Sequence, residues 1–209
     1  MKGGPKNPNQ PDLEEYLRTL LASAENGAAR QRLLQALYVE GCDGRTVRMD
    51  WNIALAYRSG EGVPKNEGKA REWTLIAAEN GHAEAQYEMG RMCLTGGGLP
   101  QDHAEAARWF HLAAEQGDPW AQCNLGTLYA DGSGVPKDWG EALKCWHLAA
   151  EQGHLVSQFN LGQWYSDAQE FETAAQFYRQ AAAQGHERAA QNLALLYQAG
   201  VASPPQTGP

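Results

Sequence analysis

The sequence predicts an all-α fold, a right-handed α-α superhelix of about eleven helices. The first observation is an internal repeat, because the block from Gly81 to Gly117 aligns without gaps with the block from Gly117 to Gly153. Equivalent residues lie thirty-six positions apart, a period typical of helical repeat arrays. The second observation is that apolar and small residues within each block follow helical spacing. The chain is therefore expected to form one continuous array of repeats rather than a closed globular domain.

Each repeat is expected to contain two helices. Segment 83–95 carries apolar and small residues at helical spacing, a Gly-rich loop follows it, and segment 103–116 carries a second stripe of the same kind. Gly117 stands just past this second helix, where a positive φ favours glycine. Asp118 is then suited to the N-cap of the next helix, and Pro119 to its first turn.

Glycine recurs in the middle of the expected first helices, at Gly90, Gly126 and Gly162. Each such glycine destabilises a helix by about 1 kcal/mol relative to alanine. Its recurrence at one repeat position therefore indicates a close approach between the two helices of a repeat. Aromatic residues of the second helices are expected to supply the buried area there: Trp73, Trp109, Trp146, Phe177 and Tyr178.

The recurring residues also indicate a family. In one repeat they are Ala121, Leu125, Gly126, Tyr129, Gly132, Gly134, Val135, Asp138, Ala142, Trp146, Ala149, Ala150 and Gly153. This pattern resembles the Sel-one-like repeat (SLR) family, a branch of the tetratricopeptide-like helical repeats, and the resemblance suggests a bacterial protein. It covers about residues 46–200. The repeats are expected near residues 46–81, 82–117, 118–153 and 154–185, with a half repeat at 186–200.

The two ends of the chain depart from the repeat. Residues 1–11 are polar and rich in Gly and Pro, which predicts a disordered leader rather than a secretory signal. Residues 12–45 are expected to form modified capping helices, because helical arrays need a polar end. Residues 201–209 are expected to form a frayed tail.

Composition excludes several classes of partner. The chain carries 25 acidic and 17 basic residues, a net charge of −8, which argues against a nucleic-acid or anionic-membrane partner. No apolar run approaches the ~20 residues that span a bilayer. Without an export signal the protein is expected to be cytoplasmic. A periplasmic location is the alternative if such a signal was removed.

No motif predicts catalysis, a cofactor or a bound metal. The loop 132–137 lacks the glycine pattern of a phosphate loop and recurs as a connecting turn. The six histidines follow the repeat without an HExxH motif, so helix starts and exposed faces explain them. The four cysteines show no CxxC spacing and are expected to be reduced and to fill small apolar positions. They are Cys42, Cys93, Cys123 and Cys145.

The SLR resemblance implies that the first helix of each repeat lines a concave face, where a partner would bind. The side chains expected there are Arg48, Trp51, Asn52, Leu55, Arg58, Glu84, Tyr87, Glu88, Arg91, Trp120, Asn124, Thr127, Phe159, Asn160 and Gln163, followed by Arg188 and Asn192. Aromatic, Arg and Asn side chains suit a recognition surface, which is expected to be richest in the N-terminal half.

Two alternatives remain open for this surface. The recurring asparagines, with Tyr87 and Phe159, are also suited to holding neighbouring repeats together. The convex face or the last helix, with Leu195 and Leu196, is a competing location for the partner.

The resemblance implies a non-catalytic scaffold or adaptor that binds a partner protein or peptide. The alternative is an immunity protein that occludes a secreted bacterial toxin or effector, for which a compact acidic array is suited. An enzyme is the least favoured class, because no catalytic constellation was found in the sequence.

Overall fold

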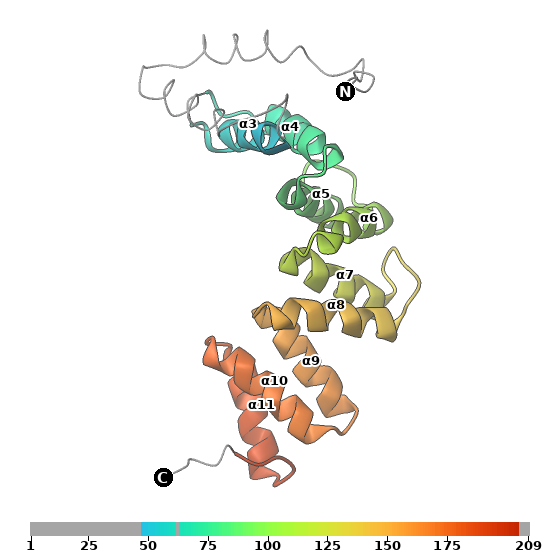
Figure 1. Ribbon diagram of the computed structural model, residues 1–209, viewed down its shortest axis with the longest axis vertical. Coiled ribbons are helices and arrows are strands. Elements are labelled where there is room, and N and C mark those ends of the chain that lie inside the picture. The colour runs from blue at the N-terminus through green and yellow to red at the C-terminus, as the bar shows by residue number, and fades with distance from the viewer. Residues whose placement is uncertain (1–46, 62, 205–209) are drawn as a thin grey trace, which may run out of the picture. The chain divides into compact units, whose positions relative to one another are not determined.

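The computed structural model describes residues 47–61 and 63–204, with side chains from residue 50 onward. The described residues form helices, turns and loops, and no strand occurs among them. The helices are α3 (Val47–Ser59), α4 (Glu67–Glu79), α5 (Ala83–Thr95), α6 (His103–Glu115), α7 (Pro119–Asp131), α8 (Trp139–Glu151), α9 (Leu155–Asp167), α10 (Phe171–Ala183) and α11 (Glu187–Gln198) (Figure 1). The predicted all-α repeat fold is confirmed. The leader expected at 1–11 and the capping helices expected at 12–45 lie outside the described residues.

The chain divides into two compact units, one ending at Ala85 and the other beginning at Gln86. In unit 1, α3 packs against α4. In unit 2, each helix from α6 to α11 packs against the next one along the chain (Figure 1). Sequential packing of this kind is what a tandem array of helical hairpins requires, since each hairpin buries its apolar face on its neighbours.

Local sequence sets where the helices begin. The Asp118 carboxylate accepts a hydrogen bond from the Ala121 N–H at 2.7 Å, and Pro119 opens α7, as the sequence predicted. At the equivalent position, His154 Nδ1 accepts from the Ser157 N–H at 3.3 Å, and His186 caps α11 in the same way. His154 and His186 therefore act as N-caps, which explains why histidine recurs at this repeat position.

The predicted close approach at the mid-helix glycines is confirmed. A Cβ atom placed on each glycine would lie on an aromatic ring of the second helix. The nearest ring atoms are Phe110 Cδ1 at 2.6 Å for Gly90, Trp146 Cδ1 at 2.6 Å for Gly126, and Tyr178 Cδ1 at 2.5 Å for Gly162. Any larger side chain would overlap these rings unless the helices moved apart.

The aromatic set expected at these contacts needs a correction. Phe110, rather than Trp109, covers Gly90, and Tyr178, rather than Phe177, covers Gly162. Both rings lie at the position three residues before the first alanine of the Ala-Ala pair that ends each second helix. The reason is helical geometry, because neighbouring residues of a helix point in different directions, and Trp109 and Phe177 stay partly exposed.

Unit 1 has different residues at the position of the glycine–aromatic contact. Ala54 stands where the later repeats have glycine, and Thr74 stands where they have a large aromatic residue. Both residues are buried, and the Thr74 hydroxyl donates to the Ala70 carbonyl at 2.8 Å. The larger residue on α3 is thus accompanied by a smaller one on α4.

A buried polar contact also recurs from repeat to repeat. In unit 2 it is an amide pair: Gln116 donates to Gln86 at 2.7 Å, Gln152 to Gln122 at 2.9 Å, and Gln184 to Gln158 at 2.8 Å. In unit 1 the equivalent contact runs from the Asn80 amide to the Asp50 carboxylate at 2.7 Å. Because the acceptor residue is buried in every case, the contact satisfies a group that would otherwise destabilise the fold.

The C-terminal residues differ from expectation as far as they are described. The tail was expected to fray from residue 201, yet Ala202 is buried and the Ser203 N–H donates to Glu172 Oε1 at 3.0 Å. A short apolar contact and one backbone hydrogen bond therefore hold residues 201–203 against α10 and α11.

Candidate partner-binding site

In unit 1 the aromatic residue expected on the binding face, Trp51, is buried and bonded to another residue of the chain. Trp51 on α3 is 6% exposed, and its Nε1 donates to Glu84 Oε2 at 2.8 Å. The indole also lies 5.5 Å from the His82 ring, and the Arg58 guanidinium stands over it at 5.4 Å. Four residues of two consecutive repeats thus form one cluster, in which Trp51 holds α3 to the start of α5. Asn52 and Leu55 are half-buried nearby, while the side chain of Arg48 lies outside the described residues.

Several residues expected on the binding face in unit 2 also make contacts with other residues of the chain. Arg91 and Glu88 form an ion pair at 2.8 Å along α5. Tyr87 is half-buried against Phe110, and burial raises the pKa of its hydroxyl. Phe159 is buried and stacks on His186 at 4.3 Å. This stack links α9 to the N-cap of α11, in the way that Trp51 is linked to His82 in unit 1.

The expected residues on α7 are more accessible. Trp120 is 55% exposed and touches the His154 ring at 4.5 Å. The Asn124 amide donates to the Trp120 carbonyl at 2.8 Å, and the Thr127 hydroxyl donates to the Cys123 carbonyl at 3.1 Å. Both bonds remain within α7, so they leave the acceptor oxygens of these side chains available.

A pocket of about 300 Å³ opens on the first-helix side of unit 2. It lies between α7 and α9 and is closed at one end by the beginning of α8. Its lining residues are Thr127, Ala130, Asp131, Trp139, Trp146, Asn160, Gln163, Trp164 and Asp167. Three of these were predicted for the binding face: Thr127, Asn160 and Gln163.

A second hollow of about 250 Å³ shares Gln163 and Asp167 with the first and extends it to α11. Its other lining residues are Ser166, Tyr178, Asn192, Leu195 and Leu196. We call the two hollows together the α7–α11 groove. Asn192 was among the residues expected to face a partner, and Leu195 is the most exposed large apolar residue in the described part of the chain, at 61%.

Four polar residues of the α7–α11 groove have no partner within the described part of the chain. Within the described residues, the Asn160 and Gln163 side chains make no hydrogen bond, and Asp131 and Asp167 make no ion pair. Trp139 is 44% exposed beside them. The groove thus combines two amides and two carboxylates that have no partner among the described residues with the indoles of Trp139 and Trp164, whereas Trp51 in unit 1 is already bonded to Glu84.

Sequence reasoning missed several lining residues of this groove, and signals in the sequence were present for four of them. Trp164 stands where the other first helices have Ala56, Met92 and Leu128. Trp139 likewise differs from the residues that open the other second helices. Asp131 and Asp167 lie thirty-six residues apart, each as the last residue of a first helix. The signals for the groove were therefore two departures from the repeat, Trp139 and Trp164, and one pair of equivalent aspartates.

A separate hollow of about 540 Å³ lies between α6, α7 and the α7–α8 loop. Its walls include Leu112, Leu125 and Val135, and Arg108 and His111 in it already contact acidic residues of α6. Gly134 brings the loop against α6, since a Cβ there would overlap the His103 backbone. This hollow is more apolar than the α7–α11 groove and offers fewer unsatisfied polar groups.

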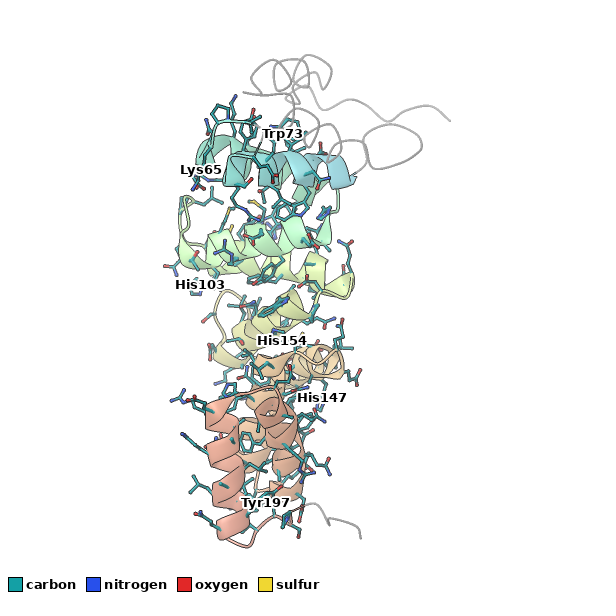
Figure 2. All side chains as sticks on the ribbon, turned by 90° about the vertical axis from the view of Figure 1, so that its left-hand side faces the viewer. Lys65, Trp73, His103, His147, His154 and Tyr197 are labelled. Atoms are coloured by element: carbon teal, nitrogen blue, oxygen red, sulfur yellow. The ribbon has the colours of Figure 1, made fainter. Side chains whose placement is uncertain are left out.

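Titratable groups in the interior serve the fold. His154 is buried among the helices of unit 2, whereas His103 lies at their edge (Figure 2), and burial lowers the pKa of His154. Burial raises the pKa of the Cys145 thiol to about 11 and also raises that of Cys123, so both favour the neutral thiol. Cys93, Cys123 and Cys145 are free and buried, as expected, and Cys42 lies outside the described residues.

The described side chains include no group of three or more His, Cys, Asp and Glu residues placed to hold a metal ion. Among the helices of the described ranges, none combines the length and the apolar character that a membrane span requires.

Comparison with known families agrees with this geometry. The model of the Sel1 repeat matches residues 50–82, 83–118, 121–154 and 155–186. The chain belongs to the Sel1 repeat family. Sel1 repeats typically mediate protein–protein interactions and are generally scaffolds without catalytic activity. No curated protein matches the chain.

Solved Sel1-like structures resemble the chain over much of its length. A protective antigen of uropathogenic Escherichia coli with an SLR fold is 31% identical with a TM-score of 0.71, over 83% of this chain and 36% of that one. A Sel1 repeat protein from Oxalobacter formigenes is 32% identical with a TM-score of 0.62, over 74% and 63% of the two chains. The chain thus spans little more than a third of the first protein and less than two thirds of the second.

A more distant likeness is to an immunity protein from Pseudomonas aeruginosa, at 23% identity and a TM-score of 0.49, over 88% of this chain and 70% of that one. A likeness of this degree carries no argument about function. The bacterial sources of the first two structures agree with the bacterial origin that the sequence suggested.

Proposed function

We propose that this Sel1 repeat protein is a non-catalytic interaction module whose α7–α11 groove receives an extended segment of a partner protein. The observation that carries the proposal is the pair of unsatisfied amides, Asn160 and Gln163, at the centre of the groove. A carboxamide both donates and accepts hydrogen bonds, so it can pair with the N–H and C=O groups of a peptide backbone.

Aromatic residues beside these amides support the same conclusion. Trp139 and Trp164 line the pocket with Asn160 and Gln163, and tryptophan is among the residue types most often found at binding hot spots. A pocket of about 300 Å³ matches one large side chain of a bound segment better than a small-molecule substrate held on all sides.

Catalysis is not part of this proposal. A Ser–His contact does occur in unit 2, where His154 Nδ1 lies 3.1 Å from Ser157 Oγ. Ser157 is completely buried and its backbone N–H is capped by the same histidine, so the pair serves the start of α9 and is out of reach of a substrate. The immunity-protein alternative stays a prediction, since no feature of the groove favours a toxin over another protein.

The test uses peptides selected on the full-length chain from a random dodecapeptide display library. Peptide affinity is measured by fluorescence anisotropy for the parent and for the double variant Asn160→Ala/Gln163→Ala. We expect the variant to bind at least tenfold more weakly, because each lost pair of hydrogen bonds leaves peptide groups unsatisfied.

The matched control is Gln176→Ala/Gln180→Ala, which removes two exposed amides from α10, outside the groove. It is expected to bind within twofold of the parent, with both variants showing the parent's helical circular dichroism. Equal binding by all three proteins would place the site outside the α7–α11 groove.

A further inference from the structure

The charges that line the α7–α11 groove are all of one sign. Asp131 ends α7 and Asp167 ends α9, and both carboxylates face the shared pocket. The lining residues of the two hollows include no Lys, Arg or His. Neither carboxylate makes an ion pair within the described residues, and both residues are exposed. The groove therefore holds two negative charges without a compensating cation among its lining residues.

Indole rings stand next to these carboxylates. Trp139 and Trp164 line the same pocket as Asp131 and Asp167. The Lys137 ammonium lies 5.1 Å from the centre of the Trp139 ring, within the range of a cation–π contact. The Trp139 indole thus already makes a cation–π contact with a positive charge of its own chain.

We propose that the groove selects a partner segment with a basic side chain, arginine in preference to lysine. The guanidinium lies beside Asp131 and Asp167 and stacks on an indole of Trp139 or Trp164. This inference rests on the proposed function, because it specifies the chemistry of the segment that the groove receives. Neither the carboxylates nor the indoles alone would specify it, whereas together they provide charge pairing and a flat cation-binding surface.

Arginine fits this combination better than lysine for a geometric reason. Its planar guanidinium donates in two directions at once while its face stacks on an aromatic ring. An ammonium pairs as a point charge and is more strongly hydrated, so it loses more on entering the pocket. The net charge of −8 adds a long-range attraction for a basic segment and disfavours an acidic one.

The experiment analyses the peptides selected from the random dodecapeptide library for their arginine content. The best peptide is then resynthesised with glutamine in place of each arginine. Both peptides are titrated against the parent and against Asp131→Asn/Asp167→Asn. The control Glu79→Gln/Glu151→Gln removes the same charge from two exposed residues outside the groove.

If the inference holds, the selected pool is enriched in arginine, and Asp131→Asn/Asp167→Asn weakens binding at least tenfold while the control stays within twofold. The glutamine peptide loses a similar factor, and the aspartate variant then causes little further loss, because the two changes remove the same interaction.

Two other outcomes are decisive. Peptides without basic residues that depend on Asn160 and Gln163 but not on the aspartates would overturn the basic-segment inference and leave the groove as the binding site. Peptides that are insensitive to both groove variants would overturn the proposed function as well.

Discussion

The α3–α4 hairpin of unit 1 and the α7–α8 hairpin of unit 2 share one architecture but differ in the residues at their closest approach. The first uses Ala54 and Thr74, whereas the second uses Gly126 and Trp146. Both arrangements bury the contact completely or nearly so. The comparison shows that a residue larger than glycine occurs on the first helix where the facing residue of the second helix is smaller than the aromatic residue of the later repeats.

The same two regions differ in how they use the aromatic side chains of their surface. Trp51 is buried and bonded to Glu84, whereas Trp139 is exposed beside unpaired carboxylates and amides. An aromatic residue in this family can therefore either join consecutive repeats or line an open groove. Exposure and pairing, rather than residue type, separate the two roles.

The largest expected effect concerns Trp51. Trp51→Ala should destabilise the protein by about 3–5 kcal/mol, because it removes a buried indole and leaves Glu84 without its donor. Trp120→Ala, at a residue that is 55% exposed, should lower stability by no more than about 1 kcal/mol. Urea unfolding followed by circular dichroism measures both. Similar losses of stability in the two variants would show that Trp51 contributes no more to the fold than the exposed Trp120.

A second variant tests the close approach in unit 2. Gly126→Leu should destabilise by about 3 kcal/mol, at the upper end for overpacking, because even a Cβ would lie 2.6 Å from Trp146. The control Gly140→Ala lies in the same repeat, where a Cβ meets only the Asp138 side chain at 3.2 Å, and it should be neutral or slightly stabilising. A melting temperature of Gly126→Leu at or above that of the parent would contradict the close approach at Gly126.

The recurring amide contact gives a smaller effect. Gln122→Leu keeps the side-chain volume but removes the acceptor for Gln152 and the donor to the Ala114 carbonyl. A loss of about 1–2 kcal/mol is expected in urea unfolding, since the contact is part-buried. Gln176→Leu, at an exposed glutamine of α10, is the control and should change stability by less than about 0.5 kcal/mol. An equal loss at both positions would show that the amide pairs contribute nothing specific.

The smallest effect is a dependence on pH. Burial lowers the pKa of His154 below its ordinary value of 6.5, so the unfolded chain binds this proton more readily than the folded one. Stability from this residue is present above pH 6.5 and is lost as the pH falls through that value toward the folded pKa. His154→Asn keeps an N-cap side chain but does not titrate.

The test compares the melting temperatures of the parent and of His154→Asn between pH 7.5 and pH 5. The variant should lose less stability on acidification than the parent. If both proteins follow the same pH profile, the buried histidine does not contribute to acid sensitivity.

Much of the fold was predictable because helices depend on neighbours in the sequence. The segment predicted at 83–95 is α5, Ala83–Thr95, and the loop glycines, the Asp118 cap and the mid-helix glycines all have the predicted roles. Hydrogen bonds between residues four apart, caps within one turn and the spacing of apolar residues are all readable along the chain.

The candidate site was predictable only in part. Thr127, Asn160 and Gln163 were expected to face a partner and do line the groove, while Trp139 and the two aspartates were not foreseen. Because the predicted binding face was derived from equivalent repeat positions, it was expected to be richest in the N-terminal half, where Trp51 is buried. Trp139 and Trp164 depart from the equivalent residues of the other repeats, whereas Asp131 and Asp167 share one repeat position. Neither pattern indicates a groove until the neighbours in space are known.

The sequence by itself determined the period, the family, the described helices and the close approach at the mid-helix glycines, because these follow from spacing that repeats along one chain. Only the tertiary structure decided which side chains are already paired. The partner of Trp51 is Glu84, thirty-three residues away, and the walls of the α7–α11 groove come from helices whose residues are separated by one or more repeats. Whether a polar or aromatic group is satisfied depends on such distant neighbours, and the local sequence does not contain that information.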